Sequence, residues 1–310
     1  MKDEYRKQAI QAVLNQNRRL KGKDKVECRY QMKYPASVER EYKRFLNSYM
    51  VVLKSTLEQE LPNLKSVIQD SSRADSNDKD RRLIRLSDFK NKANKIESVF
   101  ESIESLLYSA IGIHELKRKL SNMANMTKKL TVQEWKKALN KTLAIDILED
   151  YYMGDFYQDM LEKWVNDNVN LIVTIPRTML TEMKQQVYDG FINGKPTTQI
   201  MKSIQKEYAI SKTHAKLLAR DQLSKLNSNI TKAQQEDAGV TEYKWRTVGD
   251  GRVRERHSDL DGKIFSWSNP PIVDIKTGRR CHPGEDYQCR CIAIPVINLK
   301  ALDVPIAQAA

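Results

Sequence analysis

The sequence predicts a mostly α-helical protein, in which a long-helix N-terminal region precedes a small C-terminal α+β domain with a few antiparallel strands. Up to Gly239, apolar residues recur at intervals of three and four, the period of a helix that buries one face. After Gly239, apolar and polar residues alternate as in half-buried strands. We therefore expect four regions, which are a basic arm over residues 1–33, a long-helix antiparallel region over 34–130, a helical region over 131–238 and a C-terminal α+β module over 239–310.

Composition narrows the class of protein. The chain has 310 residues, of which 30% are charged, and a formal net charge of +13. Such an excess favours acidic partners, above all nucleic acid, over mere solubility. No apolar run is long enough to span a bilayer and residues 1–20 have no signal-peptide pattern, so we expect no membrane partner. Four cysteines are too few for a disulfide scaffold.

The first segment, residues 1–33, is strongly basic, with ten lysines and arginines against four acids. Its weak apolar stripe predicts one short helix followed by a mobile arm. Such an arm either contacts DNA or another partner, or is a solvated tail.

The next segment carries one long apolar stripe. Ser37 is a suitable N-cap, and apolar side chains follow at helical spacing until Pro62, which we expect to end or kink the helix. Residues 69–82 have no apolar side chain larger than alanine and predict a flexible loop. A second helix is predicted over 83–111, antiparallel to the first, with a break at Gly112.

Further helix signals follow up to Gly239. Thr131 and Glu134 form a capping-box pattern, and Ile175-Pro176 suggests the start of another segment. Thr197 or Thr198 is expected to open a short helix and Ser211 to cap the last one. Gly239 stands where a C′ glycine belongs.

The last module reads as strands and turns. Tyr243, Trp245 and Thr247 alternate with polar residues and predict a strand. The turns at 249–251 and 260–262 precede a strand in KIFSW, and RCIAIPV predicts the final strand.

Cysteine and histidine gather in this module. Cys289 and Cys291 lie two apart on the expected final strand, so their side chains face one way. With ligands from loops nearby, they would suit tetrahedral zinc, whereas the alternative is a buried cysteine face packed beside hydrogen-bonded histidines. The candidate metal ligands are His257, His282, Cys281, Cys289 and Cys291.

A catalytic interpretation competes with this one. His257 with Asp250, Asp259 and Asp261 could form the site of a metal-dependent nuclease or other hydrolase. The aspartates beside glycine are, however, also what tight turns require, and no nucleophile with a matched base is evident. We therefore expect a protein that is not an enzyme.

A basic patch lies in the same module. Its cations, together with Trp245, could contact phosphate, or could instead pair with Asp259 or Asp261. The candidate DNA-binding residues are Lys244, Arg246, Arg252, Arg254 and Arg256.

The order of motifs from Ile175 onward resembles a known family. The motifs are Ile175-Pro176, ARDQ at 219–222, AGVTEYKWRTVGDGRVRERHSDLDGKIF at 238–265, Pro283-Gly284, and CRC at 289–291 before IAIPV. This order is similar to that of head morphogenesis proteins of tailed bacteriophages related to phage Mu protein F. Within that family, the likeness is nearest to the minor head protein of a Bacillus subtilis siphophage.

The resemblance implies a minor capsid protein that lies inside the procapsid and assembles in the host cytoplasm. It implies binding to the phage portal protein and to double-stranded DNA, contact with the scaffold or major capsid protein, and a role in genome packaging, retention or ejection. Many relatives carry a CxxC pair where this chain has Arg254 and His257. His282 or Cys281 corresponds to the relatives' histidine, and Cys289 and Cys291 to their final pair. Because Arg254 offers no ligand atom to a metal, the zinc site that the resemblance implies lacks one of its four ligands.

Overall fold

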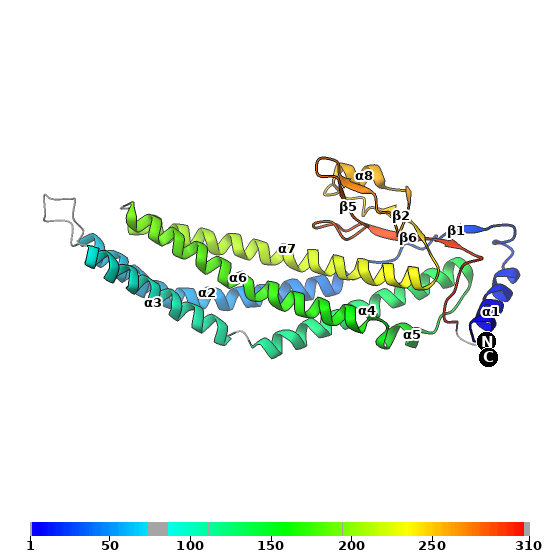
Figure 1. Cartoon of the computed structure of the whole chain (residues 1–310), viewed down its shortest axis with the longest axis horizontal. Helices are drawn as coiled ribbons and strands as arrows, with labels where there is room; N and C mark the ends of the chain where they lie inside the picture. The colour runs from blue at the N-terminus through cyan, green and yellow to red at the C-terminus, as the bar shows by residue number, and fades with distance from the viewer. Residues whose placement is uncertain (1, 74–85, 111, 194, 307–310) are drawn as a thin grey trace. The chain divides into compact units, whose positions relative to one another are not determined.

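The computed structural model describes residues 2–73, 86–110, 112–193 and 195–306 (Figure 1). It is mostly helical, with a few antiparallel strands near the C-terminus, as the sequence predicts. The chain divides into two compact units. Unit 1 comprises residues 1–41, 121–165 and 219–310, and unit 2 comprises residues 42–120 and 166–218. Each unit is thus built from segments that are far apart in sequence.

Unit 2 consists of helical segments that bury one face each. They belong to α2 (Ala36–Arg73), α3 (Leu86–Ala110), α4 (Ile113–Leu143), α6 (Gln158–Ile192) and α7 (Thr197–Asp237). The predicted stripe of α2 is buried at every turn, with Tyr42, Leu46, Met50 and Leu53 fully inaccessible. The predicted break at Gly112 separates α3 from α4.

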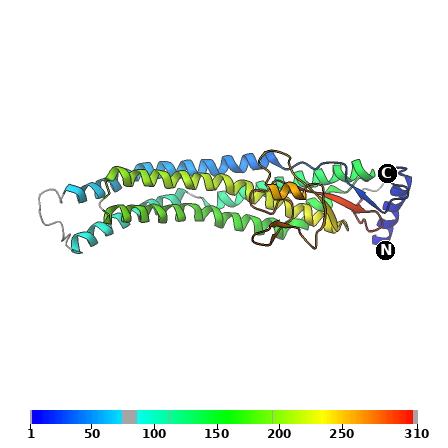
Figure 2. The ribbon, with the colours of Figure 1, turned by 90° about the horizontal axis from the view of Figure 1, so that it is seen from above.

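Side-chain hydrogen bonds cross between these helices. The Tyr42 hydroxyl donates to Asn168 Oδ1 (2.7 Å), which joins α2 to α6. The Tyr208 hydroxyl donates to the Met50 carbonyl (2.9 Å), which joins α7 to α2. The ribbon of α3 runs back in the direction opposite to α2 (Figures 1 and 2), as expected for an antiparallel pair. The predicted loop lies partly outside the described residues, since only 69–73 are described, and these are helical.

The helix boundary expected at Pro176 is wrong, and of the two outcomes expected at Pro62, an end or a kink, the end is wrong. Helix α2 continues past Pro62 to Arg73, and α6 continues through Pro176. A proline inside a helix removes one hydrogen bond and costs about 3 kcal/mol. Burial on both sides offsets this cost, because each buried Leu, Ile or Met contributes about 1.5–3 kcal/mol. Leu64 and Ile68 are buried beyond Pro62.

Two predicted caps are also wrong. Thr131 lies inside α4, where its hydroxyl donates to the Thr127 carbonyl (2.8 Å) instead of capping a helix. Glu134 accepts hydrogen bonds from the Tyr30 hydroxyl and the Lys33 backbone N–H. The short helix and the last helix expected after Thr197 are one helix, α7, and Ser211 is a buried residue within it.

A four-stranded antiparallel sheet organises unit 1. Its strand order is β1 (Lys25–Glu27), β6 (Ile292–Asn298), β2 (Glu242–Arg246) and β3 (Ile264–Ser266). Val26 pairs with Ile297, so a strand near the N-terminus closes the edge of the C-terminal sheet. The short helix predicted within residues 1–33 is α1 (Lys2–Gln16), whereas the expectation of a mobile arm after it is wrong at β1, which pairs with β6.

Shorter elements complete unit 1. They are α5 (Glu149–Met153), the 3₁₀ turn η1 (Asp155–Tyr157), α8 (Glu255–Leu260) and a two-stranded sheet of β4 (Ile272–Asp274) and β5 (Arg279–Arg280). Gly239 has φ +72°, and the N–H groups of Gly239 and Val240 bond back to Glu236 and Gln235. This is the predicted glycine-terminated helix end.

The core of the module lies on one face of this sheet. Tyr243 and Trp245 of β2 are fully buried and pack with Leu260, Trp267 and Val273. The predicted alternation in β2 is therefore correct, because Glu242, Lys244 and Arg246 are less buried.

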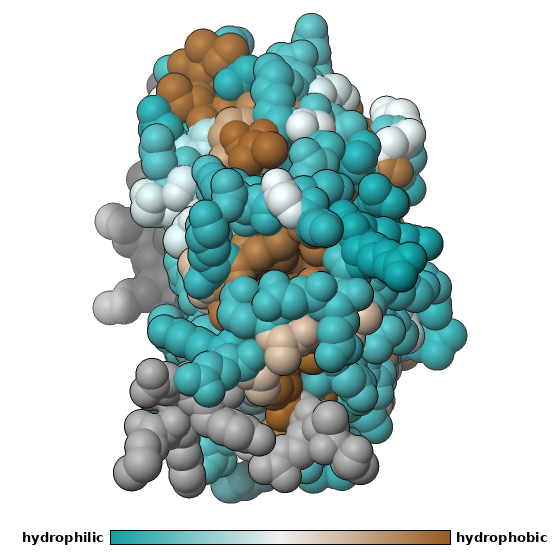
Figure 3. All heavy atoms as spheres, turned by 90° about the vertical axis from the view of Figure 1, so that its right-hand side faces the viewer, coloured by the Kyte–Doolittle hydropathy of each residue, from teal (hydrophilic) through white to brown (hydrophobic). Residues whose placement is uncertain are grey.

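The outer surface agrees with the composition. The face drawn in Figure 3 is mostly hydrophilic, with smaller apolar patches between polar side chains. Over the described residues, none of the helices combines the length and the apolar character needed to cross a bilayer.

Candidate functional site

Three buried side chains form a cluster beside the sheet. His257 comes from α8, and Cys289 and Cys291 come from the loop that precedes β6. The prediction that both cysteines lie on the final strand is therefore wrong, because β6 begins at Ile292. Both sulfurs nevertheless face His257 Nδ1. A backbone N–H from Gly284 and another from Cys291 each donate to Cys289 Sγ at 3.4 Å. We call His257, Cys289 and Cys291 the His-Cys-Cys cluster.

The spacing of the His-Cys-Cys cluster fits a shared metal ion. His257 Nδ1 lies 3.5 Å from Cys289 Sγ and 3.6 Å from Cys291 Sγ, and all three ligand atoms are within 4.8 Å of one another. With Zn–S near 2.3 Å and Zn–N near 2.0 Å, a tetrahedral ion places nitrogen and sulfur about 3.5 Å apart. The same distances also suit weak hydrogen bonds between thiols and the ring.

Asp286 orients the histidine. Its Oδ2 lies 3.1 Å from His257 Nε2, and its side chain is 1% exposed. Nε2–H donates to the carboxylate and Nδ1 faces the two sulfurs, where it can bind a metal ion as a neutral ring or, when protonated as well, donate to a thiolate. Such a carboxylate behind a histidine is typical of metal ligands. Arg254 Nη1 contacts Oδ2 at 3.2 Å, and Arg279 Nη2 lies 2.9 Å from Oδ1.

The two thiols are not equivalent. The pKa of Cys289 is held well below its ordinary value by a hydrogen bond from Cys291 and by His257, despite burial. The pKa of Cys291 is raised by the same contact with Cys289 and by burial. Cys289, which also accepts two backbone N–H groups, is therefore the more acidic thiol of the pair.

Of the five predicted metal ligands, the structure brings three together. His282 is buried elsewhere, with Nδ1 2.9 Å from the Tyr243 hydroxyl and its ring centroid 4.8 Å from that of Trp267. Burial lowers the pKa of His282. Cys281 is only partly buried, and the residues described contain no ligand cluster that includes it. Among the described residues, the group with metal-ligand spacing thus contains Cys289 and Cys291 but neither His282 nor Cys281.

A small pocket of about 120 Å³ reaches the His-Cys-Cys cluster from outside. Arginines dominate its wall, and none of them offers a ligand atom to a metal. The arginines lining it are Arg220, Arg252, Arg254 and Arg290.

Every predicted DNA-binding cation has a carboxylate partner. Lys244 pairs with Glu27 at 2.6 Å and Arg246 with Asp261 at 3.3 Å. The other three pairs are Arg252–Asp250 (3.1 Å), Arg254–Asp286 (3.2 Å) and Arg256–Asp259 (3.8 Å). The alternative that these cations pair with acids, including Asp259 and Asp261, is thus observed. Trp245 is fully buried and is not part of the basic surface.

The predicted catalytic carboxylates do not converge on His257. Asp261 accepts the Thr247 backbone N–H and pairs with Arg246, while Asp250 holds Arg252 and Arg290. Among the described residues, the one group with metal-ligand spacing contains none of these aspartates. The partner that does reach His257 is Asp286, which no sequence motif indicated.

Comparisons with known proteins show a family match in the C-terminal part of the chain. Residues 181–294 match the family described as "Phage Mu protein F like protein". The family resemblance inferred from the motifs is confirmed over this segment, and the narrower likeness to a Bacillus subtilis siphophage protein is not shown. An uncharacterised protein of Haemophilus influenzae is 36% identical over 131 residues, which are 42% of this chain and 28% of that relative. The chain thus spans less than a third of that protein's length. No solved structure matches the chain.

Proposed function

From the phage Mu protein F-like segment at residues 181–294, we propose that the chain is a head morphogenesis protein of a tailed bacteriophage. In this proposal it is a minor capsid protein inside the virion and assembles in the host cytoplasm. It binds the portal protein and double-stranded DNA, contacts the scaffold or major capsid protein, and acts in genome packaging, retention or ejection. The match of this segment is the observation that carries the proposal.

The charge of the chain supports the DNA part. A net charge of +13 draws a protein to duplex DNA by counterion release, and such binding weakens steeply with salt. A protein inside a filled head lies beside densely packed phosphate, where this attraction is useful.

Filter binding with duplex DNA across a salt series tests the DNA part. We expect binding at low salt and a linear fall of log K with log salt concentration. Absence of binding at low salt, or a flat response, would overturn it. Phage heads that assemble, fill and infect normally without this protein would overturn the morphogenesis role.

We further propose that the His-Cys-Cys cluster binds a structural zinc ion. Two thiolates and one imidazole are ligands that zinc prefers, and the Asp286 contact holds the imidazole in the required tautomer. Arg254, where the family resemblance implies a cysteine in many relatives, contacts Asp286 and the Tyr287 carbonyl instead. The chain itself would therefore supply three ligands. When bound, the ion would tie α8 to the loop before β6.

Metal analysis of anaerobically purified protein tests this site. We expect about one zinc per chain, lost in Cys289→Ser with Cys291→Ser and kept in Cys281→Ser, the matched control outside the cluster. Cobalt substitution should give thiolate-to-metal absorption in the native protein and in the Cys281→Ser control, but not in the double variant. Metal-free native protein would leave packing as the role of these cysteines.

We propose that the chain is not an enzyme, because two of its candidate catalytic carboxylates, Asp250 and Asp261, pair with arginines and accept hydrogen bonds from backbone N–H groups. The runner-up, a metal-dependent nuclease near His257, is tested with plasmid DNA and magnesium or manganese. Cleavage that disappears in His257→Ala would replace our proposal with the runner-up.

A further inference from the structure

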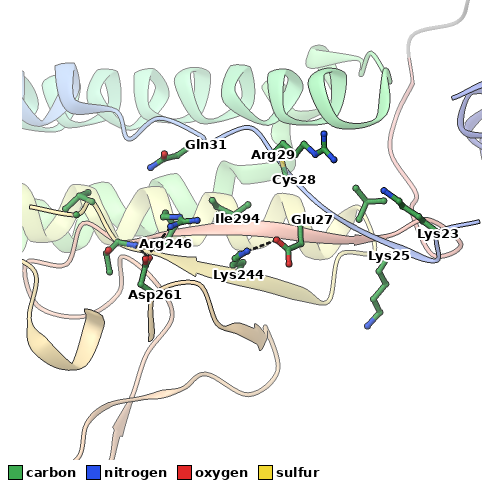
Figure 4. Close-up of a pocket in the computed structure, with 14 residues that line it drawn as sticks. Lys23, Lys25, Glu27, Cys28, Arg29, Gln31, Lys244, Arg246, Asp261 and Ile294 are labelled. Atoms are coloured by element: carbon green, nitrogen blue, oxygen red, sulfur yellow. Dashed lines mark hydrogen bonds and ion pairs between the residues drawn. The ribbon is translucent and has the colours of Figure 1, made fainter. Parts of the chain in front are cut away.

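A groove of about 770 Å³ lies over the face of the sheet opposite its core (Figure 4). Lys244 and Arg246 reach it from β2, because they alternate with the buried Tyr243 and Trp245. Ile294 of β6, which pairs with Lys244, also lines it. The segment around β1 closes the other side. We call this the basic groove, and its charged lining residues are Lys23, Lys25, Glu27, Arg29, Lys244, Arg246 and Asp261.

The basic groove joins two cationic segments that are remote in sequence. Residues 23–29 and residues 244–246 each carry basic side chains, and pairing of both β1 and β2 with β6 brings them to one surface. Five cations line the groove against two carboxylates, Glu27 and Asp261, which leaves an excess of three positive charges.

The cations fall into two groups. Lys25 reaches Glu242 at 2.6 Å and Lys244 reaches Glu27 at 2.6 Å, so two ion pairs cross the central strand β6. Within the described residues, the side chains of Lys23 and Arg29 have no ion pair or hydrogen bond, and both are exposed. Exposed ion pairs contribute only about 0–1 kcal/mol, so an arriving phosphate can replace Glu27 or Glu242 at little cost.

The residues that line the basic groove also favour double-stranded over single-stranded nucleic acid. Proteins that hold single strands stack the bases on aromatic rings. No aromatic side chain lines the basic groove among the residues described, since Tyr243 and Trp245 face the core. What the groove offers is flexible cations on a polar surface, which suits the phosphate backbone of a duplex whose bases remain stacked.

We propose that the basic groove is the site where this protein binds the phosphate backbone of double-stranded DNA. Lys23 and Arg29 make the first contacts, and Lys25, Lys244 and Arg246 exchange carboxylate partners for phosphates as the duplex settles. The inference rests on the DNA-binding part of the proposed function and assigns it to one surface of unit 1.

A charge-matched pair of double variants tests the assignment. The groove variant carries Lys23→Gln and Arg29→Gln, and the control carries Lys263→Gln and Lys276→Gln, which remove the same charge from exposed positions outside the groove. Each lost phosphate contact lowers the salt slope by about 0.9, so two contacts lower it by about 1.8. With binding at 1 M salt unchanged, affinity at 0.1 M should fall about 60-fold. The control should keep the wild-type slope.

The outcomes separate the groove from the function. If wild-type protein binds duplex DNA but both variants weaken it equally, the groove assignment fails and DNA binding by overall charge remains. If wild-type protein does not bind duplex DNA, the DNA part of the proposed function fails as well. Equal competition by poly(dT) overturns the duplex preference. Loss of portal binding with unchanged DNA binding in the groove variant also overturns the assignment.

Discussion

Asp286 is a buried carboxylate that two arginines and one histidine of the C-terminal module contact. Its carboxylate contacts His257, Arg254 and Arg279, and its side chain is 1% exposed. We predict that Asp286→Asn, which keeps the size but removes the charge, destabilises the protein strongly. Removing one partner of a fully buried ion pair costs about 3–5 kcal/mol.

The expected cost is somewhat smaller than that range. The side chains of Arg254 and Arg279 are 46% and 35% exposed, so both guanidinium groups can turn toward water. The asparagine oxygen can also still accept one hydrogen bond. We therefore expect Asp286→Asn to lower the free energy of unfolding by about 2–3 kcal/mol.

Asp250 provides the matched control. It also holds two arginines, Arg252 and Arg290, but its side chain is 35% exposed. Exposed pairs contribute little, so Asp250→Asn should cost much less than Asp286→Asn. Urea unfolding followed by tryptophan fluorescence measures both, because Trp245 packs edge-on against His257 with ring centroids 5.4 Å apart. Equal losses in the two variants would refute the dependence on burial.

Two further predictions concern Gly239 and His282. Gly239→Ala should destabilise more than Gly262→Ala in the same urea assay. Both glycines have φ above +70°, which costs alanine about 1–2 kcal/mol, but only at Gly239 would the new Cβ meet a backbone atom, 2.3 Å from the Ala301 oxygen. Equal losses of unfolding free energy in the two variants would show that the backbone near Gly239 and Ala301 moves to accommodate the new Cβ. Burial lowers the pKa of His282, so below about pH 6.5 the unfolded state takes up a proton that the folded state refuses. Unfolding free energy should therefore fall as pH drops from 6.5 toward the folded pKa, and less so in His282→Gln; an unchanged slope in the variant would contradict this origin.

Local periodicity was sufficient to predict most of the fold. The stripe through Tyr42, Leu46 and Met50 and the alternation of Tyr243 with Trp245 both correspond to buried faces. Gly239 ends α7 as expected, because a left-handed residue at that point is a local requirement. Features that are determined by residues close to one another in the chain can thus be predicted from the sequence.

Features that depend on distant packing were not visible. Pro176 is a strong local signal for a helix boundary, yet α6 continues because buried residues such as Ile172 and Met179 stabilise it from both sides. The three residues of β1 carry no strand pattern of their own, and their pairing is decided by β6.

The candidate metal site shows the same limit. Composition identified five candidate ligands in one module, but the choice of His257, Cys289 and Cys291 depends on the position of α8, which the sequence did not predict. Asp286 was missed because a single aspartate in a turn-rich loop carries no spacing signal. The basic groove was missed for a similar reason, since its two cationic segments meet only through β6.

The pairing of Val26 with Ile297 has a consequence for biosynthesis. A ribosome delivers β1 long before β6, so β1 has to wait unpaired while the intervening helices emerge. Closing so long a loop is slow, and a waiting strand exposes hydrogen-bonding groups to other chains. Nascent polypeptides stalled before β6 should therefore be the form of this protein that is most vulnerable to proteases and to self-association.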